Sequence, residues 1–268
     1  MPELPEVETI VRGLAPLLSG RRIQRLRAAR RPPVFEGSSL PPRSVAGRTI
    51  QAVSRTGKFI ILDLGDDVRL AVHLRMTGNL IYRRAAGMLP YTRATFELDD
   101  GARLIFADVR KFGRMRVFRG DPRAALGVGL DPFSAELDAR SFADLVRGRQ
   151  TPVKTWLLDQ RRIAGVGNIY ACESLFHARL RPKRRVGKLS SAEREKLLDA
   201  LRRVLRKAIR HRGSSVDDYV DAEGMEGDFQ KQLSVYGRAG MPCRRCGTPI
   251  RRIVLGQRGT FYCPVCQR

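Results

Sequence analysis

The spacing of hydrophobic residues changes along the chain. Between residues 5 and 18 the apolar side chains recur every three or four positions, which lines one face of a helix. From about Arg22 to Phe118 the pattern becomes short alternating or apolar runs, such as Val68–Leu74. Polar turn sequences separate these runs, for example Asp66-Asp67 and Asp99-Asp100-Gly101. This region therefore predicts an antiparallel β-sandwich or barrel.

The chain turns helical after about Pro132. Ser190 and Glu193 have the spacing of a capping box, and the apolar residues behind them repeat with helical spacing until Gly213. Basic residues occupy the opposite face of this helix, which is typical of an amphipathic helix with a solvated basic face. They are Arg202, Arg203, Arg206, Lys207 and Arg210. Residues 213–240 are rich in Gly, Asp and Ser and predict a long loop or linker.

Length and composition indicate the number of domains and the class of binding partner. The 268 residues suit two domains, and 43% hydrophobic residues allow a sizeable core. The 51 Lys and Arg exceed the 27 Asp and Glu, which leaves a net charge of +24. This excess favours nucleic acid as the partner, although an arginine-rich proteome would also produce a basic surface. No apolar run approaches the roughly 18 residues of a membrane span, and no secretory signal is evident. We therefore expect a soluble intracellular protein.

Four of the five cysteines lie near the end of the chain as two Cys-x-x-Cys pairs, 16 residues apart. Two such knuckles on a β-hairpin form a tetrahedral four-thiolate zinc site, which leaves no open position and is therefore structural. Two disulfides are the alternative, which a reducing compartment disfavours. The predicted ligands are Cys243, Cys246, Cys263 and Cys266. The fifth cysteine, Cys172, is expected to be a buried apolar residue.

The segment between the knuckles is basic, and Gly256 and Gly259 indicate its turn. A rigid hairpin with a cationic tip suits contact with a phosphate backbone.

The N-terminus offers a candidate nucleophile. Pro2 follows Met1, and removal of the methionine would expose a secondary amine. An α-amino group has a pKa of roughly 7.7–8.0, so part of it is neutral and nucleophilic at cellular pH. Glu3 and Glu6 lie beside it as proton carriers. On the residues alone this pattern is weak evidence, because many proteins begin with Met-Pro.

Ordered motifs along nearly the whole chain resemble the bacterial formamidopyrimidine-DNA glycosylases of the Fpg/Nei family. They are Met1–Thr9, His73–Gly78, Asp108–Gly113, Gly165–Ala171, Val235–Arg238 and the cysteine module. The resemblance implies a two-domain α+β protein: an N-terminal β-sandwich with an N-terminal helix, and a C-terminal helix–two-turns–helix domain with a zinc-finger β-hairpin. The expected boundaries are 1–132, 133–234 and 235–268.

The resemblance also implies an activity: excision of oxidised purines in DNA base excision repair, followed by strand cleavage. In this reading Pro2 attacks C1′ of the damaged nucleoside and Glu3 shuttles protons. Lys58 contacts the phosphate next to the lesion and assists β-elimination, whereas Arg258 grips the same region for δ-elimination. Asn168 binds phosphate at a helix N-terminus.

A second set of residues is implied in DNA binding. Met76, Arg110 and Phe112 match the trio that fills the gap left by an everted base, which the chemistry requires because an extruded nucleotide leaves an unstacked hole. Read alone, Met76 and Phe112 resemble core residues. Arg149 and Lys154 match positions near the damaged base or a phosphate. Both are interpreted as lying just before a helix, where a solvated surface role is an alternative.

Some positions depart from the family pattern. Tyr91 stands where relatives have a phosphate-contacting histidine, and Thr77 replaces a glutamate or serine near the lesion. The loop Ser214–Gln230, which closes over 8-oxoguanine in the family, has its own sequence here. These departures affect substrate preference rather than the reaction class. His73 is interpreted as a packed strand residue outside the active site.

Three other functions remain open at this point. Endonuclease VIII-like enzymes share the Pro2–Glu3 chemistry but prefer oxidised pyrimidines, and Leu4, where they have glycine, argues against that reading. A non-catalytic damaged-DNA-binding protein or an RNA-binding zinc-ribbon protein would also be basic. A dinucleotide-binding turn at Gly165–Tyr170 is rejected, because no strand precedes it and no third glycine follows. We expect a monomer that binds double-stranded DNA in the bacterial cytoplasm, associated with the nucleoid, with one zinc ion and no membrane contact.

Overall fold

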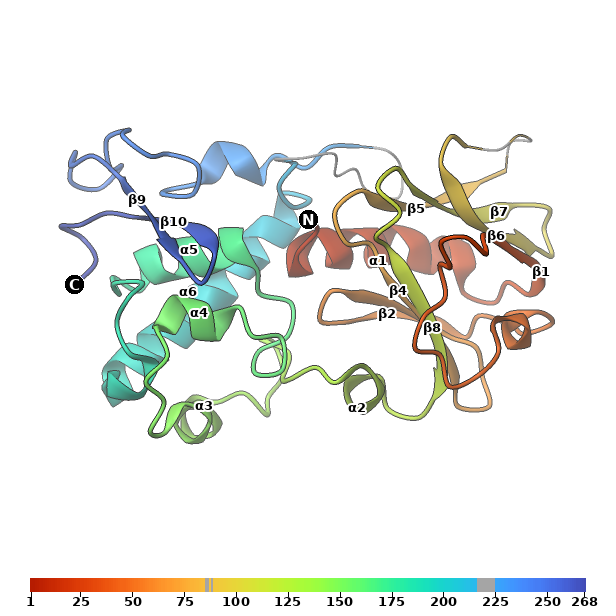
Figure 1. Cartoon of the computed structure of the whole chain (residues 1–268), viewed down its shortest axis with the longest axis horizontal. Helices are drawn as coiled ribbons and strands as arrows, with labels where there is room; N and C mark the ends of the chain where they lie inside the picture. The colour runs from red at the N-terminus through yellow and green to blue at the C-terminus, as the bar shows by residue number, and fades with distance from the viewer. Residues whose placement is uncertain (85–86, 88, 216–224) are drawn as a thin grey trace. The chain divides into compact units, whose positions relative to one another are not determined.

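The computed structural model describes residues 1–84, 87, 89–215 and 225–268. The chain forms two compact units (Figure 1). The first contains Met1–Gly127 and the described residues of His211–Asp228, and the second contains Val128–Arg210 and Phe229–Arg268. Among the described residues no helix is both long and apolar enough to cross a membrane.

The first unit opens with helix α1 (Leu4–Leu18), as its apolar spacing predicts. Pro5 lies in the first turn, where its missing N–H removes no helical hydrogen bond. The predicted apolar face is buried, and Ile10 and Leu14 pack into the same core as the β-strands. The helix continues past Pro16 to its last residue, so this proline does not end it.

Two four-stranded antiparallel sheets follow, which confirms the predicted sandwich. The first sheet has the order β1 (Ile23–Ala28), β6 (Thr92–Leu98), β7 (Arg103–Asp108) and β5 (Gly78–Arg83). The second has the order β2 (Ala52–Thr56), β3 (Phe59–Asp63), β4 (Val68–His73) and β8 (Arg114–Arg119). A 3-10 turn, η1 (Pro42–Val45), and a short helix, α2 (Pro122–Leu126), complete the unit. Asp66 and Asp67 both adopt positive φ angles, as a tight hairpin turn requires.

The second unit is helical and ends in a hairpin. Its elements are α3 (Ala139–Val146), α4 (Val153–Leu157), α5 (Asn168–His177), η2 (Val186–Lys188), α6 (Ser191–Arg210), η3 (Phe229–Gln232), β9 (Arg251–Leu255) and β10 (Arg258–Tyr262). The predicted capping box begins α6, because Ser190 Oγ accepts from the Glu193 backbone and the Glu193 carboxylate accepts from the Ser190 backbone. The predicted apolar stripe of α6 is buried.

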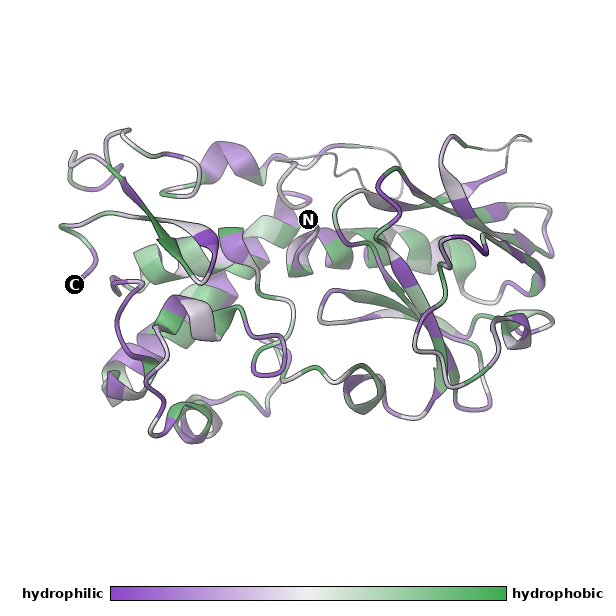
Figure 2. Cartoon of the chain, in the orientation of Figure 1, coloured by the Kyte–Doolittle hydropathy of each residue, from purple (hydrophilic) through white to green (hydrophobic). Residues whose placement is uncertain are grey.

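Four of the five basic residues on α6 (Arg203, Arg206, Lys207 and Arg210) are exposed, as the sequence suggests, and Arg202 is half-buried. Figure 2 shows both hydrophobic and hydrophilic segments along this helix. Arg202 donates to the backbone oxygens of Pro132 and Leu137, and Arg206 lies over the Phe133 ring with its guanidinium carbon 5.4 Å from the ring centroid. These two arginines therefore tie the start of the second unit to α6, a contact that helical periodicity alone does not indicate.

The predicted linker 213–240 is only partly an irregular loop. Residues 216–224 of it, and so most of the loop Ser214–Gln230, lie outside the described residues. Phe229, Leu233 and Val235 are buried, so the segment after 228 packs into the second unit. The polar composition led to the linker interpretation, but these three apolar residues are buried.

Candidate active site and zinc centre

The N-terminal segment of the first unit is enclosed. Pro2 and Glu3 are buried, and Glu3 leaves only 3% of its surface exposed. The Glu6 carboxylate accepts hydrogen bonds from the backbone N–H of Glu3 and of Ser214, both at 2.8 Å. One buried carboxylate thus joins the residue after the candidate nucleophile to a segment more than 200 residues later. Glu6 therefore holds the position of the N-terminal segment.

Lys58 lies on the two-residue turn between β2 and β3 and is nevertheless buried, with 6% of its surface exposed. Its surroundings are basic, since Lys58, Arg75 and Arg116 all act on nearby His73. Burial, followed by these positive charges, lowers the pKa of His73 to about 3. The His73 ring is buried in β4, stacks edge-on against Phe59 and accepts the Arg75 backbone N–H at its Nδ1. His73 is therefore a neutral packed residue, as predicted.

The neutral state of His73 makes folding stability depend on pH. The unfolded chain binds a proton at this residue below about pH 6.5, whereas the folded chain does so only near pH 3. The free energy of unfolding must therefore fall as pH drops through this window, and at pH 5.5 it is about 1.4 kcal/mol lower than at pH 7.5. Urea unfolding at pH 7.5 and at pH 5.5 gives the free energy of unfolding at each pH. The difference between the two values should be smaller by about 1.4 kcal/mol in His73→Asn than in the wild type. An unchanged pH effect in the variant would contradict the assignment.

Met76 lies on the β4–β5 loop, and Arg110 and Phe112 lie on the β7–β8 loop. The two loops are adjacent, because the Arg110 backbone N–H donates to Thr77 Oγ1 at 3.2 Å. Met76 is 36% exposed and Phe112 48% exposed, so neither is a core residue. The guanidinium carbon of Arg110 lies 4.9 Å from the centroid of the Phe112 ring. The surface therefore presents two apolar side chains and a stacked cation, which suits insertion into a base stack.

Asp108 joins these two loops, and sequence reasoning did not single it out. This carboxylate is 1% exposed and accepts from Thr77 Oγ1 at 2.5 Å, from the Arg110 backbone N–H at 3.2 Å and from the Gly113 backbone N–H at 2.7 Å. A side chain at Gly113 would collide with Phe106, which explains the glycine. The signal available in the sequence was that Asp108 is the first residue of the motif that contains Arg110 and Phe112, at the end of an expected strand.

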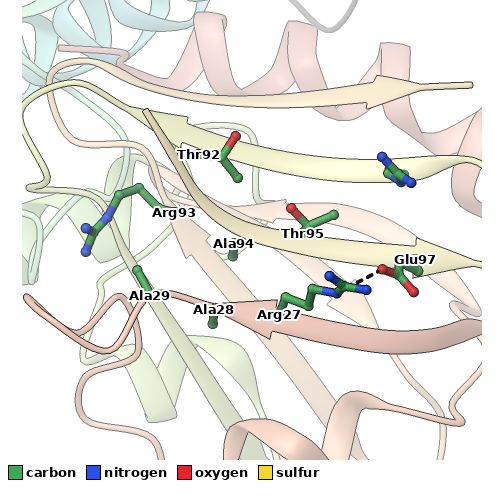
Figure 3. A pocket seen from close by; sticks show the side chains of 9 residues that line it. Arg27, Ala28, Ala29, Thr92, Arg93, Ala94, Thr95 and Glu97 are labelled. Atoms are coloured by element: carbon green, nitrogen blue, oxygen red, sulfur yellow. Dashed lines mark ion pairs between the residues drawn. The ribbon is translucent and has the colours of Figure 1, made fainter. Parts of the chain in front are cut away.

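Tyr91 is 61% exposed and precedes β6 with a positive φ angle, so its ring is available for contact. Next to it, a pocket of about 270 Å³ lies on β1, β6 and β7. Figure 3 shows that Arg27 points toward Glu97, with which it forms an ion pair at 3.1 Å, while Arg93 points away from both. Arg93 donates to the Pro32 oxygen. Arg27 and Arg93 are therefore both held by partners within the first unit.

In the second unit, Asn168 connects helix α5 to the zinc hairpin. It is the first residue of α5, after Gly167, and its Nδ2 donates to the Gly259 backbone oxygen at 3.0 Å. The hairpin turn is formed by Gly256 and Gln257, both with positive φ angles, whereas Gly259 lies within β10. The prediction that Gly259 marks the turn was therefore wrong, because it pairs with Val254 in the ladder.

Arg258 begins β10 beside this turn and is exposed. The second unit therefore brings the exposed Arg258 and the N-terminus of α5 together through the Asn168–Gly259 hydrogen bond.

Arg149 and Lys154 have different surroundings. Arg149 is exposed and lies four residues before α4, as the sequence suggests. Lys154 instead lies inside α4 and is 0% exposed. Its predicted position just before a helix was therefore wrong, and its burial excludes the alternative of a solvated surface role. Helix α4 begins directly after Pro152, and Val153, Trp156 and Leu157 are buried in it together with Lys154.

Glu173 is a further residue that sequence reasoning missed. This α5 carboxylate is 1% exposed and accepts from the backbone N–H groups of Ser234, Val235 and Tyr236, each at 2.9 Å. Burial raises the pKa of Glu173 although the three donors oppose the shift. Glu173 therefore anchors the segment that leads into the cysteine module.

The four module cysteines form one cluster, in which all four Sγ atoms lie within 4.8 Å of one another. Tetrahedral zinc with Zn–S bonds of about 2.3 Å places its sulfurs about 3.8 Å apart. The Cys243–Cys266 and Cys246–Cys263 sulfur distances are 4.0 and 3.5 Å, so the cluster fits one structural zinc ion. Cys172 is fully buried in the apolar cluster beside it, as predicted.

Comparisons with known proteins agree with these features. Residues 1–115 match the family model for the formamidopyrimidine-DNA glycosylase N-terminal domain, residues 128–220 its H2TH domain, and residues 240–268 the zinc finger found in FPG and IleRS. The chain is 44% identical to the formamidopyrimidine-DNA glycosylase of Chloroflexus aggregans over 273 residues, which cover 100% of this chain and 98% of the relative.

Two solved structures are also similar. The MutM (Fpg) protein of Thermus thermophilus has a TM-score of 0.88 and 39% identity, with 99% of this chain and 98% of that chain covered. The Lactococcus lactis Fpg in complex with abasic site-containing DNA has a TM-score of 0.88 and 35% identity, with 99% of each chain covered. Three family models in order, a full-length relative and two similar structures place this sandwich, helical region and zinc hairpin in one family, so the chain belongs to the formamidopyrimidine-DNA glycosylases.

Proposed function

We propose that this chain is a bifunctional glycosylase and AP lyase that removes oxidised purines from double-stranded DNA during base excision repair. The observation that carries this proposal is the full-length similarity to formamidopyrimidine-DNA glycosylases, which includes both the Pro2 segment and the hairpin of Arg258. The net charge of +24 supports binding to a polyanion. The protein would act in the bacterial cytoplasm, on the DNA of the nucleoid.

The proposed chemistry begins at the N-terminus. After removal of Met1, the Pro2 nitrogen attacks C1′ and loses its proton while the bond from C1′ to the base breaks and the base leaves protonated. The sugar ring then opens at the C1′–O4′ bond, and Glu3 delivers the proton that O4′ takes up. The resulting iminium withdraws electrons and acidifies the C2′ proton. Loss of that proton expels the phosphate on the 3′ side, and a second elimination expels the phosphate on the 5′ side. A one-nucleotide gap remains.

The other residues are assigned to DNA binding and elimination. Lys58 contacts the phosphate next to the lesion and assists the first elimination, and Arg258 assists the second. Asn168, Tyr91, Arg149 and the buried Lys154 bind the backbone or the damaged base. In this assignment residues 1–132 carry the chemistry, residues 133–234 hold the duplex and residues 235–268 present Arg258. The zinc ion stabilises the hairpin and takes no part in bond breaking.

Incision of two matched duplexes tests this function. One contains a single 8-oxoguanine and the other a single thymine glycol, at equal enzyme and salt concentrations. We expect faster excision of 8-oxoguanine and products of β,δ-elimination. Preference for thymine glycol would support an endonuclease VIII-like activity. Binding to both duplexes without excision would support a non-catalytic DNA-binding protein.

Phe112→Ala is expected to weaken binding to lesion-containing DNA without destabilising the fold. Stacking of an aromatic ring on a base contributes about 1–3 kcal/mol, which corresponds to roughly 5- to 150-fold in affinity. The ring is 48% exposed, so little packing is lost with it. Fluorescence anisotropy with lesion duplex measures the affinity, and thermal unfolding provides the control. An affinity within twofold of the wild type would contradict the insertion of Phe112.

A further inference from the structure

The turn that carries Lys58 has an unusual environment. A two-residue turn at the end of a hairpin normally exposes its side chains, yet Lys58 is 6% exposed. Gly57 before it has a φ angle of 60°, a left-handed conformation that glycine adopts readily. A buried ammonium on such a turn requires neighbouring groups that keep the turn in one conformation.

Arg55, three residues earlier on β2, supplies such a contact. Its side chain is 7% exposed. Its NH1 group donates to the Gly57 backbone oxygen at 3.1 Å, and its Nε donates to Glu8 Oε2 at 3.0 Å. The guanidinium is planar and its donors have a fixed geometry, so these two bonds set the distance and direction between both acceptors. Arg55 therefore connects the Lys58 turn to helix α1.

The acceptor on α1 is an ionised carboxylate. Burial raises the pKa of Glu8, but hydrogen bonds and charges from Arg12 and Arg55 outweigh it, so the pKa lies below its usual value. Glu8 lies on the second turn of α1, the helix that starts two residues after Pro2. A helix is a stiff element, so a contact at Glu8 is transmitted to the start of α1. The bridge thus relates two parts of the proposed active site.

We infer that Arg55 is a positioning residue. Through its bonds to Gly57 and Glu8 it holds the turn of Lys58 at a fixed position relative to α1, the helix that follows Pro2. The inference rests on the proposed function, since it concerns the step in which Lys58 assists elimination from the Pro2 iminium. Arg55 touches neither the sugar nor the phosphate. Its removal allows Lys58 to move while Pro2, held separately through Glu3 and Glu6, stays in place.

The test separates imine formation from elimination. A duplex with a preformed abasic site is incubated with the zinc-loaded enzyme, and borohydride trapping measures the Pro2 imine while gel analysis measures strand cleavage. In Arg55→Met we expect cleavage to slow about 100-fold, as a displacement of a positioned group can cause, with imine formation within about threefold of wild type. The trapped imine should therefore accumulate. Arg55→Lys keeps the charge but not the planar fork, so we expect it to recover cleavage only in part.

Arg12→Met is the matched control. Arg12 also pairs with Glu8, at 2.8 Å, but its side chain is 65% exposed. Its replacement removes the positive charge of Arg12 beside Glu8 and leaves the Arg55 contact to Gly57 in place. Cleavage should therefore stay at the wild-type rate. Thermal unfolding of all variants shows whether the buried position tolerates the change.

The outcomes are distinguishable. A parallel loss of imine formation and cleavage in Arg55→Lys, which retains the charge, would show a structural role only and would overturn the inference. Wild-type cleavage in Arg55→Met would overturn it as well. If the wild-type enzyme forms no trappable imine, the proposed function fails before the role of Arg55 is reached.

Discussion

One glycine inserted between Met1 and Pro2 is expected to abolish base excision. The added residue converts the secondary amine of Pro2 into a tertiary amide, whose nitrogen is not nucleophilic. Removal of a covalent nucleophile lowers the rate constant of an enzyme by several orders of magnitude, so we expect the excision rate to fall by at least about 10³-fold. Single-turnover excision of 8-oxoguanine and borohydride trapping on an abasic duplex measure the effect.

The same extended protein supplies its own control. Zinc content and affinity for undamaged duplex should change little, because the cysteine module and most of the basic surface are distant in sequence from the insertion. Pro2→Gly leaves a primary amine at the N-terminus and should retain some trapping. Normal excision by the extended protein would show that the Pro2 nitrogen is not the nucleophile.

Cys263→Ser is expected to remove both the zinc ion and strand cleavage. Structural zinc contributes about 10–16 kcal/mol to the folding of zinc-finger peptides at neutral pH, far more than a short hairpin gains from its own contacts. Without zinc, Arg258 and the Gly259 oxygen that accepts from Asn168 lose their placement. We expect zinc content to fall from one ion per chain to nearly none, and cleavage to fall by at least about 100-fold. Metal analysis and the abasic-site cleavage assay measure both.

Cys172→Ala provides the comparison for that experiment. Cys172 is fully buried beside the module but is not one of the four clustered cysteines, so its replacement should cost about 1–2 kcal/mol of stability and leave zinc content unchanged. A Cys263→Ser protein that retains zinc and full cleavage activity would contradict the structural role of the metal.

The fold was predictable where the sequence signals are local. The α1 helix, the hairpin turn at Asp66-Asp67 and the Ser190–Glu193 capping box each depend on residues close together in the chain. The four cysteines are also a local signal, because the spacing of each pair already defines a knuckle. These elements agree with the structure for that reason.

Burial was harder to predict, because it depends on contacts with distant residues. Lys154 reads as a solvated lysine and is fully buried, whereas Phe112 reads as a core residue and is half exposed. Arg202 reads as part of a solvated face and instead donates to residues 65 and 70 positions away. Hydrophobic periodicity does not separate a buried side chain from an exposed one at these three positions, because the neighbouring residues in the sequence would be the same in both situations.

By itself the sequence determined the order of helix, sandwich, helical region and zinc hairpin, together with the basic character that favours DNA and the motifs that indicate the family. Local periodicity, turn residues and ligand spacing carry that information. Only the tertiary structure decided how the candidate residues are held. Asp108 joins the loops of Met76 and Phe112, and Arg55 joins the turn of Lys58 to helix α1. These hydrogen bonds connect residues up to 47 positions apart, and no pattern along the chain specifies which distant partner a buried polar group will find.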